Sequence, residues 1–284
     1  MQIVHEPSAF RDACEAARRA GHRVGIVPTM GALHAGHLAL IDEARKHGAT
    51  FVVVTVFVNP LQFGPNEDFS RYPRTLPEDA AACEARKVDV VFAPAREAMY
   101  PAGFATHVQV RGLTDVLEGV FRPGHFDGVT TVVCKLFALV GPAVAVFGRK
   151  DYQQWRVLSR MVRDLDLPIE MLGMPTVREA DGLALSSRNR YLSSQERERA
   201  LAISRGLRAA RALFEGGERD PRALEDAARL PIEGAFDSID YVAIADADSL
   251  APLERVQDRA VIAVAARIGK TRLIDNVVLG EDRI

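Results

Sequence analysis

Residues 50–58 read TFVVVTVFV, a run in which every residue except two threonines is apolar. β-Branched and aromatic residues favour strands, and a strand that is apolar on both faces is typical of a central parallel strand covered by helices. Asn59 and Pro60 end the run. This feature constrains the fold most strongly, because it predicts a parallel sheet buried inside an α/β domain.

Other strand-like runs alternate with helical stretches along the first two-thirds of the chain. We expect strands at residues 24–29, 50–58, 88–92 and 143–147, and helices at residues 37–47, 78–86 and from GRKDYQQW to about residue 164. Alternation of this kind predicts a Rossmann-like, mostly parallel sheet with helices on both faces.

The pattern changes after about residue 176. A capping box of the Ser-x-x-Glu type at residues 193–196 begins a helix with one apolar face. Two strand-like runs follow at residues 239–244 and 260–266. We therefore expect a Rossmann-like domain over residues 1–176 and a smaller α+β domain over residues 177–284.

Charge and composition exclude several classes of partner. With 36 Lys and Arg against 38 Asp and Glu, the net charge is −2, so no global basic field favours nucleic acid or an anionic membrane. The apolar runs are too short to span a bilayer, and the first ten residues lack the pattern of a secretory signal. Cys14, Cys83 and Cys134 lie far apart and predict reduced thiols. We expect a cytoplasmic protein.

The strongest local signal is PTMGALHAGH at residues 28–37, between the strand 24–29 and the helix that follows it. Ligands of open α/β sheets bind at the carboxyl ends of strands, and N–H groups at the start of a helix attract anions. His34 and His37 are three residues apart and share one side of a helical turn. Two imidazoles in that position can donate hydrogen bonds to phosphate oxygens.

Other interpretations of this segment stay open. A glycine-rich turn before a helix is common without any ligand. A zinc site would need further ligands that the spacing does not identify. Gly31 and Gly36 have the spacing of half a Walker A loop, but His37 and Leu38 stand where that loop needs Lys and Ser or Thr.

Two more polar clusters suit a nucleotide. Residues 148–154, GRKDYQQ, follow a predicted strand, and residues 185–189 read LSSRN. A lysine can reach phosphates, an aspartate can accept hydrogen bonds from ribose hydroxyls, and serine with arginine suits phosphate oxygens. Each cluster by itself is more often a solvated loop.

Two more loops suit the binding of a second substrate beside a nucleotide. The loop with Asn59, Gln62 and Asn66 follows the strand 50–58, and its amides should face the same crevice. Gln62 and Gln154 are neutral, so they can orient a hydroxylated carboxylate without cancelling its charge. The loop 122–128, RPGHFDG, lines a pocket or caps the next helix.

Five segments in this order resemble the pantoate–β-alanine ligase family, and the resemblance covers essentially the whole chain. The segments are PTMGALHAGH at 28–37, FVNPLQFGPNEDFSRYPRTL at 57–76, RPGHFDGVTTVV at 122–133, FGRKDYQQ at 147–154 and LSSRNRYLS at 185–193. Residues 34–37 stand for the HIGH-type signature of the nucleotidyltransferase superfamily.

The resemblance implies an ATP- and Mg²⁺-dependent condensation of pantoate with β-alanine through pantoyl adenylate, within pantothenate biosynthesis. It also implies a homodimer, and a smaller domain that closes over the ATP site. The loop 64–77 is a candidate lid, because excluding water would protect the adenylate.

The resemblance also assigns residues by position. It implies ATP binding by Met30, Gly31, Ala32, Leu33, His34, Ala35, Gly36, His37, Gly148, Arg149, Lys150, Asp151, Val177, Leu185, Ser186, Ser187 and Arg188. Gln62 and Gln154 match pantoate-binding glutamines, and Gln62 also matches a β-alanine contact. His37, His34 and Lys150 are the expected catalytic residues, and no metal ligand is identified. Arg149 and Leu185 depart from the family pattern.

Two other functions remain open at this level. A nucleotidyltransferase would stop at an adenylated product, and a non-catalytic ATP-binding regulator would bind the nucleotide without releasing pyrophosphate.

Overall fold

A computed structural model describes residues 1–65, 67–282 and 284, which form two compact units. The first unit comprises residues 1–114, 122–149 and 154–174, and the second comprises residues 115–121, 150–153 and 175–284. Two short segments that precede residue 176 thus group with the second unit. The expected domain boundary at that residue stays a prediction.

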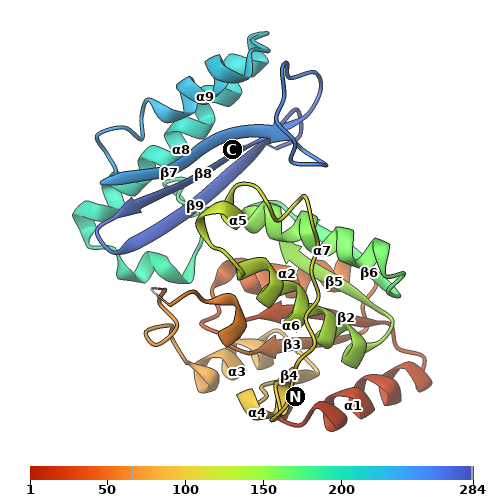
Figure 1. Cartoon of the computed structure of the whole chain (residues 1–284). Helices are drawn as coiled ribbons and strands as arrows, with labels where there is room; N and C mark the ends of the chain where they lie inside the picture. The colour runs from red at the N-terminus through yellow and green to blue at the C-terminus, as the bar shows by residue number, and fades with distance from the viewer. Residues whose placement is uncertain (66, 283) are drawn as a thin grey trace. The chain divides into compact units, whose positions relative to one another are not determined.

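The first unit is built on a sheet of six parallel strands in the order β1-β4-β3-β2-β5-β6 (Figure 1). The strands are β1 (Gln2–Val4), β2 (Val24–Thr29), β3 (Phe51–Val56), β4 (Val90–Phe92), β5 (Ala143–Gly148) and β6 (Ile169–Met174). The predicted Rossmann-like sheet is confirmed.

Helices cover both faces of this sheet, as the doubly apolar strands require. The longer helices are α1 (Pro7–Arg19), α2 (Ala35–Lys46), α3 (Leu76–Ala85), α6 (His125–Val140) and α7 (Tyr152–Asp164). Ile26 and Val53 belong to a core that includes side chains of α1, α6 and α7. Their neighbours Val27 and Val54 belong to the opposite core, with side chains of α2 and α3.

The strand order creates a switch point at the carboxyl edge of the sheet. From β2 the chain moves to β3 and β4 on one side, and then returns to β5 on the other side of β2. The loops that follow β2 and β5 therefore begin at neighbouring strand ends. This is the place where open α/β sheets bind their ligands.

Shorter elements complete the first half of the chain. They are the helices α4 (Arg96–Met99) and α5 (Glu118–Phe121) and the 3₁₀ turns η1 (Pro60–Gln62) and η2 (Arg149–Asp151). The predicted elements agree with the structure to within two residues at most ends. One difference has a clear cause: α2 begins at Ala35 rather than at residue 37, because His34 caps it.

The second unit contains a three-stranded antiparallel sheet of β7 (Ser238–Asp246), β8 (Ala260–Ile268) and β9 (Thr271–Leu279). The 3₁₀ turn η3 (Ser187–Tyr191) precedes α8 (Ser194–Glu215), and α9 (Pro221–Arg229) follows. Ile203, Leu207 and Leu224 from these two helices share one core with Ile262 of β8. The predicted capping box is confirmed, because Ser193 and Glu196 exchange hydrogen bonds of 2.8 and 3.3 Å.

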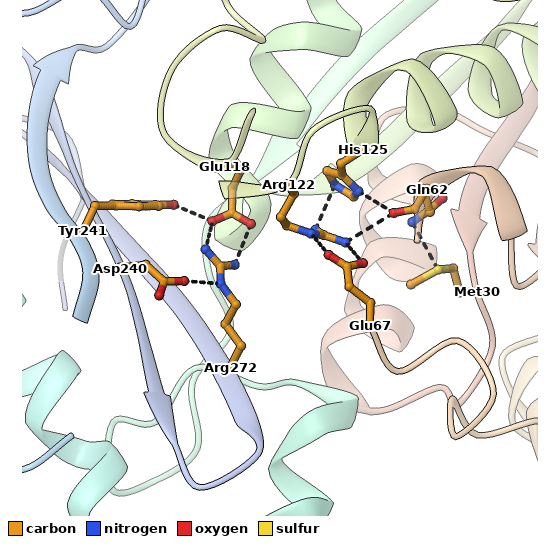
Figure 2. A network of polar contacts seen from close by, with 9 residues as sticks. All are labelled: Met30, Gln62, Glu67, Glu118, Arg122, His125, Asp240, Tyr241 and Arg272. Atoms are coloured by element: carbon orange, nitrogen blue, oxygen red, sulfur yellow. Dashed lines mark hydrogen bonds and ion pairs between the residues drawn. The ribbon is translucent and has the colours of Figure 1, made fainter. Parts of the chain in front are cut away.

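Glu118 explains why residues 115–121 belong to the second unit. Glu118 is 6 % exposed, and its carboxylate accepts hydrogen bonds of 2.7 and 2.6 Å from the guanidinium of Arg272 (Figure 2). The Tyr241 hydroxyl donates to the same carboxylate at 2.8 Å. Gln153 accepts from the Glu118 backbone N–H and donates to the Val116 carbonyl. The segment is therefore held through both its backbone and its carboxylate.

Candidate active site

The loop after β2 has a backbone that only certain residues allow. Gly31 and Ala32 both have positive φ angles, of 83° and 51°. A Cβ on Gly31 would lie 2.9 Å from a carboxylate oxygen of Asp79 and 3.0 Å from a methyl carbon of Val56. Glycine is therefore required at position 31 by both conformation and space.

Asp79 of α3 fixes this loop and is a residue that the sequence analysis did not identify. Its buried carboxylate accepts hydrogen bonds from the backbone N–H groups of Ala32 and Leu33 at 3.0 and 2.7 Å. The Thr75 hydroxyl also donates to it, at 3.2 Å. These two N–H groups are thus engaged within the protein.

His34 and His37 lie at the N-terminus of α2 with ring centroids 4.1 Å apart. The Nδ1 atom of His34 accepts the Gly36 N–H at 3.2 Å, and the Nδ1 atom of His37 accepts the His34 N–H at 3.4 Å. A ring nitrogen that accepts a hydrogen bond carries no proton, so each neutral ring has its proton on Nε2. Both rings therefore present an Nε2–H donor at a helix N-terminus, where the dipole favours an anion.

Gln62 is held by its backbone and by its side chain in the first unit. His125 donates from Nδ1 to the Gln62 carbonyl at 2.8 Å, and Arg122 donates to the same oxygen at 3.3 Å (Figure 2). The Gln62 side-chain oxygen accepts from Asn59 at 3.0 Å, and its Nε2 lies 3.3 Å from the sulfur of Met30. The amide oxygen is thus engaged, and the NH₂ group is the part of Gln62 that can meet a substrate oxygen.

Asn59 has its amide orientation fixed by backbone groups. Its Oδ1 accepts the Leu61 N–H at 3.3 Å, and its Nδ2 donates to the Gly128 carbonyl at 3.0 Å. If the amide were flipped, its NH₂ group would face the Leu61 N–H, a second donor, and its oxygen would face the Gly128 carbonyl, a second acceptor. The hydroxyl of Tyr100 adds a further hydrogen bond to Oδ1, of 2.8 Å.

Arg122 joins the loop before α6 to the loop after β3. Its guanidinium makes a two-point ion pair with Glu67, at 2.6 and 2.7 Å, and donates to Nε2 of His125 at 3.0 Å. Burial raises the pKa of Glu67, but the hydrogen bond and charge of Arg122 outweigh it and hold that pKa below its usual value. The predicted polar loop 122–128 therefore supports Gln62. Asn66 lies outside the described residues.

The second unit holds Lys150, Asp151 and the later clusters. Asn276 donates from Nδ2 to the Lys150 carbonyl at 2.7 Å. The turn between Val177 and Leu185 closes through a hydrogen bond of 3.0 Å from the Leu185 N–H to the Val177 carbonyl. The Ser186 hydroxyl caps η3 by accepting the Arg188 N–H at 3.2 Å.

The expected site residues thus form two groups. The first unit contains Met30, Gly31, Ala32, Leu33, His34, Ala35, Gly36, His37, Gln62, Gly148, Arg149 and Gln154; the second contains Lys150, Asp151, Val177, Leu185, Ser186, Ser187 and Arg188. Arg149, which departs from the family pattern, is 7 % exposed. That these two groups of residues form one ATP site stays a prediction.

Some sites are absent from the part of the chain that the structure describes. No group of three or more His, Cys, Asp or Glu side chains among these residues could hold a metal ion. The three cysteines are free. Over the same residues, no helix has the length and apolar character needed to cross a membrane.

The fold and the loops at its switch point define the class of α/β nucleotide-binding proteins. Within this class, the sequence model described as "Pantoate-beta-alanine ligase" matches residues 2–278. The chain therefore belongs to the pantoate–β-alanine ligase family, which makes it a ligase of pantothenate biosynthesis. The predicted family and the class of enzyme are confirmed.

Curated relatives and solved structures agree with this assignment. The chain is 54 % identical to the pantothenate synthetase of Moorella thermoacetica, over 98 % of this chain and 99 % of the relative. A crystal structure of pantothenate synthetase from Thermus thermophilus matches with a TM-score of 0.92 and 49 % identity, over 98 % of this chain and 99 % of that one. A Francisella tularensis pantoate–β-alanine ligase, complexed with "Beta-gamma ATP and Beta-alanine", matches with a TM-score of 0.82 and 33 % identity, over 99 % of each chain.

Proposed function

We propose that this ligase joins pantoate to β-alanine in two steps with ATP as the activating substrate. A carboxylate does not react usefully with an amine, because its oxygen is a poor leaving group. In the first step, a carboxylate oxygen of pantoate attacks the α-phosphorus of ATP and pyrophosphate leaves. In the second, the neutral amine of β-alanine attacks the acyl carbon of pantoyl adenylate, AMP leaves, and the amine loses a proton.

The pair of imidazoles at the start of α2 is the observation that carries this proposal. Because His34 and His37 accept backbone N–H groups at Nδ1, their Nε2–H donors are oriented before any ligand arrives. Donors that need no reorganisation are the ones that stabilise developing charge most strongly. We assign these two donors and the Lys150 ammonium to the α-phosphate and the departing pyrophosphate.

The remaining residues divide between nucleotide and pantoate. We assign the loop of residues 30–37, Gly148 to Asp151, Val177 and Leu185 to Arg188 to ATP, with Ser186, Ser187 and Arg188 on the outer phosphates. Hydroxyl and guanidinium donors suit phosphate oxygens. The Francisella tularensis relative, which was solved with an ATP compound and β-alanine, supports this assignment.

Gln62 and Gln154 are the proposed pantoate residues. The Asn59 contact leaves the Gln62 NH₂ group as its donor, which suits a hydroxyl or carboxylate oxygen. A neutral amide orients that oxygen without reducing the nucleophilicity of the carboxylate. We also assign a β-alanine contact to Gln62. Replacing Gln154 with Ala should weaken pantoate binding more than ATP binding.

Mg²⁺ would enter bound to the phosphates of ATP. Mg²⁺ usually keeps several waters and binds substrate phosphates with one or two carboxylates, so it needs no cage of protein ligands. The absence of a three-residue acidic or histidine cluster among the described residues is compatible with this arrangement. When bound, the ion would neutralise charge on the leaving pyrophosphate. We further propose a homodimer in the cytoplasm.

Product analysis tests the proposal. The protein is incubated with ATP, pantoate and either β-alanine or a set of other amines, and AMP and pyrophosphate are measured. We expect pyrophosphate release to require pantoate, and rapid AMP release to require β-alanine. Pyrophosphate without amine-dependent AMP would indicate a nucleotidyltransferase, and ATP binding without pyrophosphate would indicate a regulator. Either result would refute the proposed function.

A further inference from the structure

β9 holds two of the segments assigned to ATP, although none of its own residues belongs to the expected site. Adjacent residues of this strand, Asp275 and Asn276, make the contacts. We propose that Asp275 and Asn276 are positioning residues for ATP, because they fix the Lys150 turn and the Val177–Leu185 turn relative to each other. The identity of the ligand rests on the proposed function.

Asn276 fixes the Lys150 turn. Asn276 is 4 % exposed, and its Nδ2 donates to the Lys150 carbonyl at 2.7 Å. The backbone N–H of Asn276 donates to Oδ1 of Asp275 at 2.8 Å, and β9 is an outer strand of the sheet β7-β8-β9. Because the amide is buried and the carbonyl is part of the chain, this contact sets where the Lys150 side chain begins.

Asp275 fixes the other segment through Arg178. The buried carboxylate accepts hydrogen bonds of 2.6 and 3.0 Å from the two terminal nitrogens of the Arg178 guanidinium. The same guanidinium donates to the carbonyls of Gly182 and Asn276, at 3.2 and 3.3 Å. Arg178 also forms a β-bridge with Ala184. One side chain thus ties both arms of the Val177–Leu185 turn to β9.

β9 is itself held in a sheet and can serve as a common support for the two turns. Asp275 and Asn276 pair with Val264 and Ala263 of the central strand β8, and both partners are buried. The two turns lie far apart in the sequence, so no short stretch of chain sets their separation. In-line attack on the α-phosphorus requires the separation of the two turns to be fixed, since a misplacement of about 1 Å can cost on the order of 10²-fold in rate.

The primary test is Asn276→Asp, which keeps the size of the side chain but removes the donor that faces the Lys150 carbonyl. We expect kcat/KM for ATP to fall by about 10- to 100-fold, because the Lys150 turn shifts. The KM for pantoate should change less than about twofold, because Gln62 and its supporting contacts belong to the first unit. A role in stability alone would not separate the two substrates.

Val277→Ala is the matched control. Val277 is the next residue of β9, is fully buried and points to the opposite face of the strand. Its truncation should lower the melting temperature and leave kcat/KM for ATP unchanged. If Val277→Ala lowers kcat/KM for ATP as much as Asn276→Asp does, the loss reflects general destabilisation and the proposal is wrong.

One further measurement and one further variant complete the test. Titration calorimetry with ATP alone measures binding without the reaction, so a wild-type protein that binds ATP but makes no pantothenate would refute only the proposed function. If Asn276→Asp does not fold, Asn276→Ser shortens the side chain, so that it no longer reaches the Lys150 carbonyl, without any change of charge. Wild-type ATP affinity in the folded variant, or equal losses for ATP and pantoate, would overturn the positioning role.

Discussion

The Nδ1 atom of His37 accepts the backbone N–H of His34 at 3.4 Å, and the two rings are tilted by 35° with centroids 4.1 Å apart. His34 in turn accepts the Gly36 N–H. The backbone of one short segment therefore orients both imidazoles. Replacing one imidazole is therefore expected to affect the reaction more than the fold.

His37→Ala should slow pantoate-dependent pyrophosphate release by about 10²–10³-fold, the usual cost of removing one preorganised donor to a developing charge. The melting temperature should change little, because the side chain is partly exposed. His47→Ala, at the other end of the same helix, is the control and should keep wild-type activity. An unchanged rate for His37→Ala would remove this histidine from the mechanism.

The sequence predicted four of the six strands of the first unit, because these four are strongly apolar. The run 50–58 corresponds to β3, and each of the other three expected strands corresponds to one strand of the parallel sheet. The strand β1 has only three residues, which is too short for a pattern to be recognised. β9 was not predicted because Asp275 and Asn276 interrupt its apolar run, and their burial depends on partners distant in sequence.

Glu67 should give the stability of the protein a measurable pH dependence. The Arg122 contact outweighs burial and lowers the pKa of Glu67 below its ordinary value of 4.5. The folded carboxyl therefore binds its proton less readily than the unfolded one. Its contribution to stability is present above the unfolded pKa and is lost as the pH falls through the folded pKa.

Glu67→Gln should therefore lower the free energy of unfolding at pH 7 by about 1 kcal/mol, and the difference from wild type should shrink as the pH falls below 4.5. Urea unfolding at several pH values measures it. Glu84→Gln, an exposed carboxylate on α3, serves as the control for adding an amide. A difference that grows towards acid pH would contradict the assigned direction of the pKa shift.

The cysteines should be unreactive in the native protein. Burial raises the pKa of the Cys14 thiol to about 12, against a smaller lowering by Arg18. Burial and then the charge of Asp79 raise the pKa of Cys83 to about 12. Burial also raises the pKa of Cys134. Since the thiolate is the reactive form, very little of it exists near neutral pH.

A thiol reagent at pH 8 should therefore label the native protein slowly, and should label all three cysteines once the protein is unfolded. Ala138→Cys, which places a thiol at an exposed position on α6, should react at once and shows that the reagent is active. Fast labelling of Cys14 or Cys83 in the native state would mean that the cores around them open frequently.

The support of the candidate site could not be predicted from the sequence. The motifs indicated His34, His37 and Gln62, because glycines and polar residues follow predicted strands there. Nothing in a linear pattern connects Asp79 to the loop of residues 31–33, or Tyr100 to Asn59. Such contacts depend on how helices pack across the sheet, and their residue types are common elsewhere in the chain.

Gly128 offers a test of how closely α6 must approach the turn that carries Gln62. A Cβ at this position would lie 2.6 Å from the Gln62 backbone nitrogen, and closer still to the Leu61 carbonyl. Alanine favours helices over glycine by about 1 kcal/mol, so Gly128→Ala would stabilise α6 if space allowed. Because the obstruction is backbone, either α6 or the Pro60–Gln62 turn has to move.

Gly128→Ala should consequently lower kcat/KM for pantoate by on the order of 10²-fold, because the displaced turn misplaces the Gln62 amide. The effect on ATP affinity should be much smaller. Ala138→Gly, an exposed position on the same helix, is the control: it lowers helix propensity without approaching the turn and should leave pantoate kinetics unchanged. Wild-type pantoate kinetics in folded Gly128→Ala would show that the position of Gln62 does not limit the reaction.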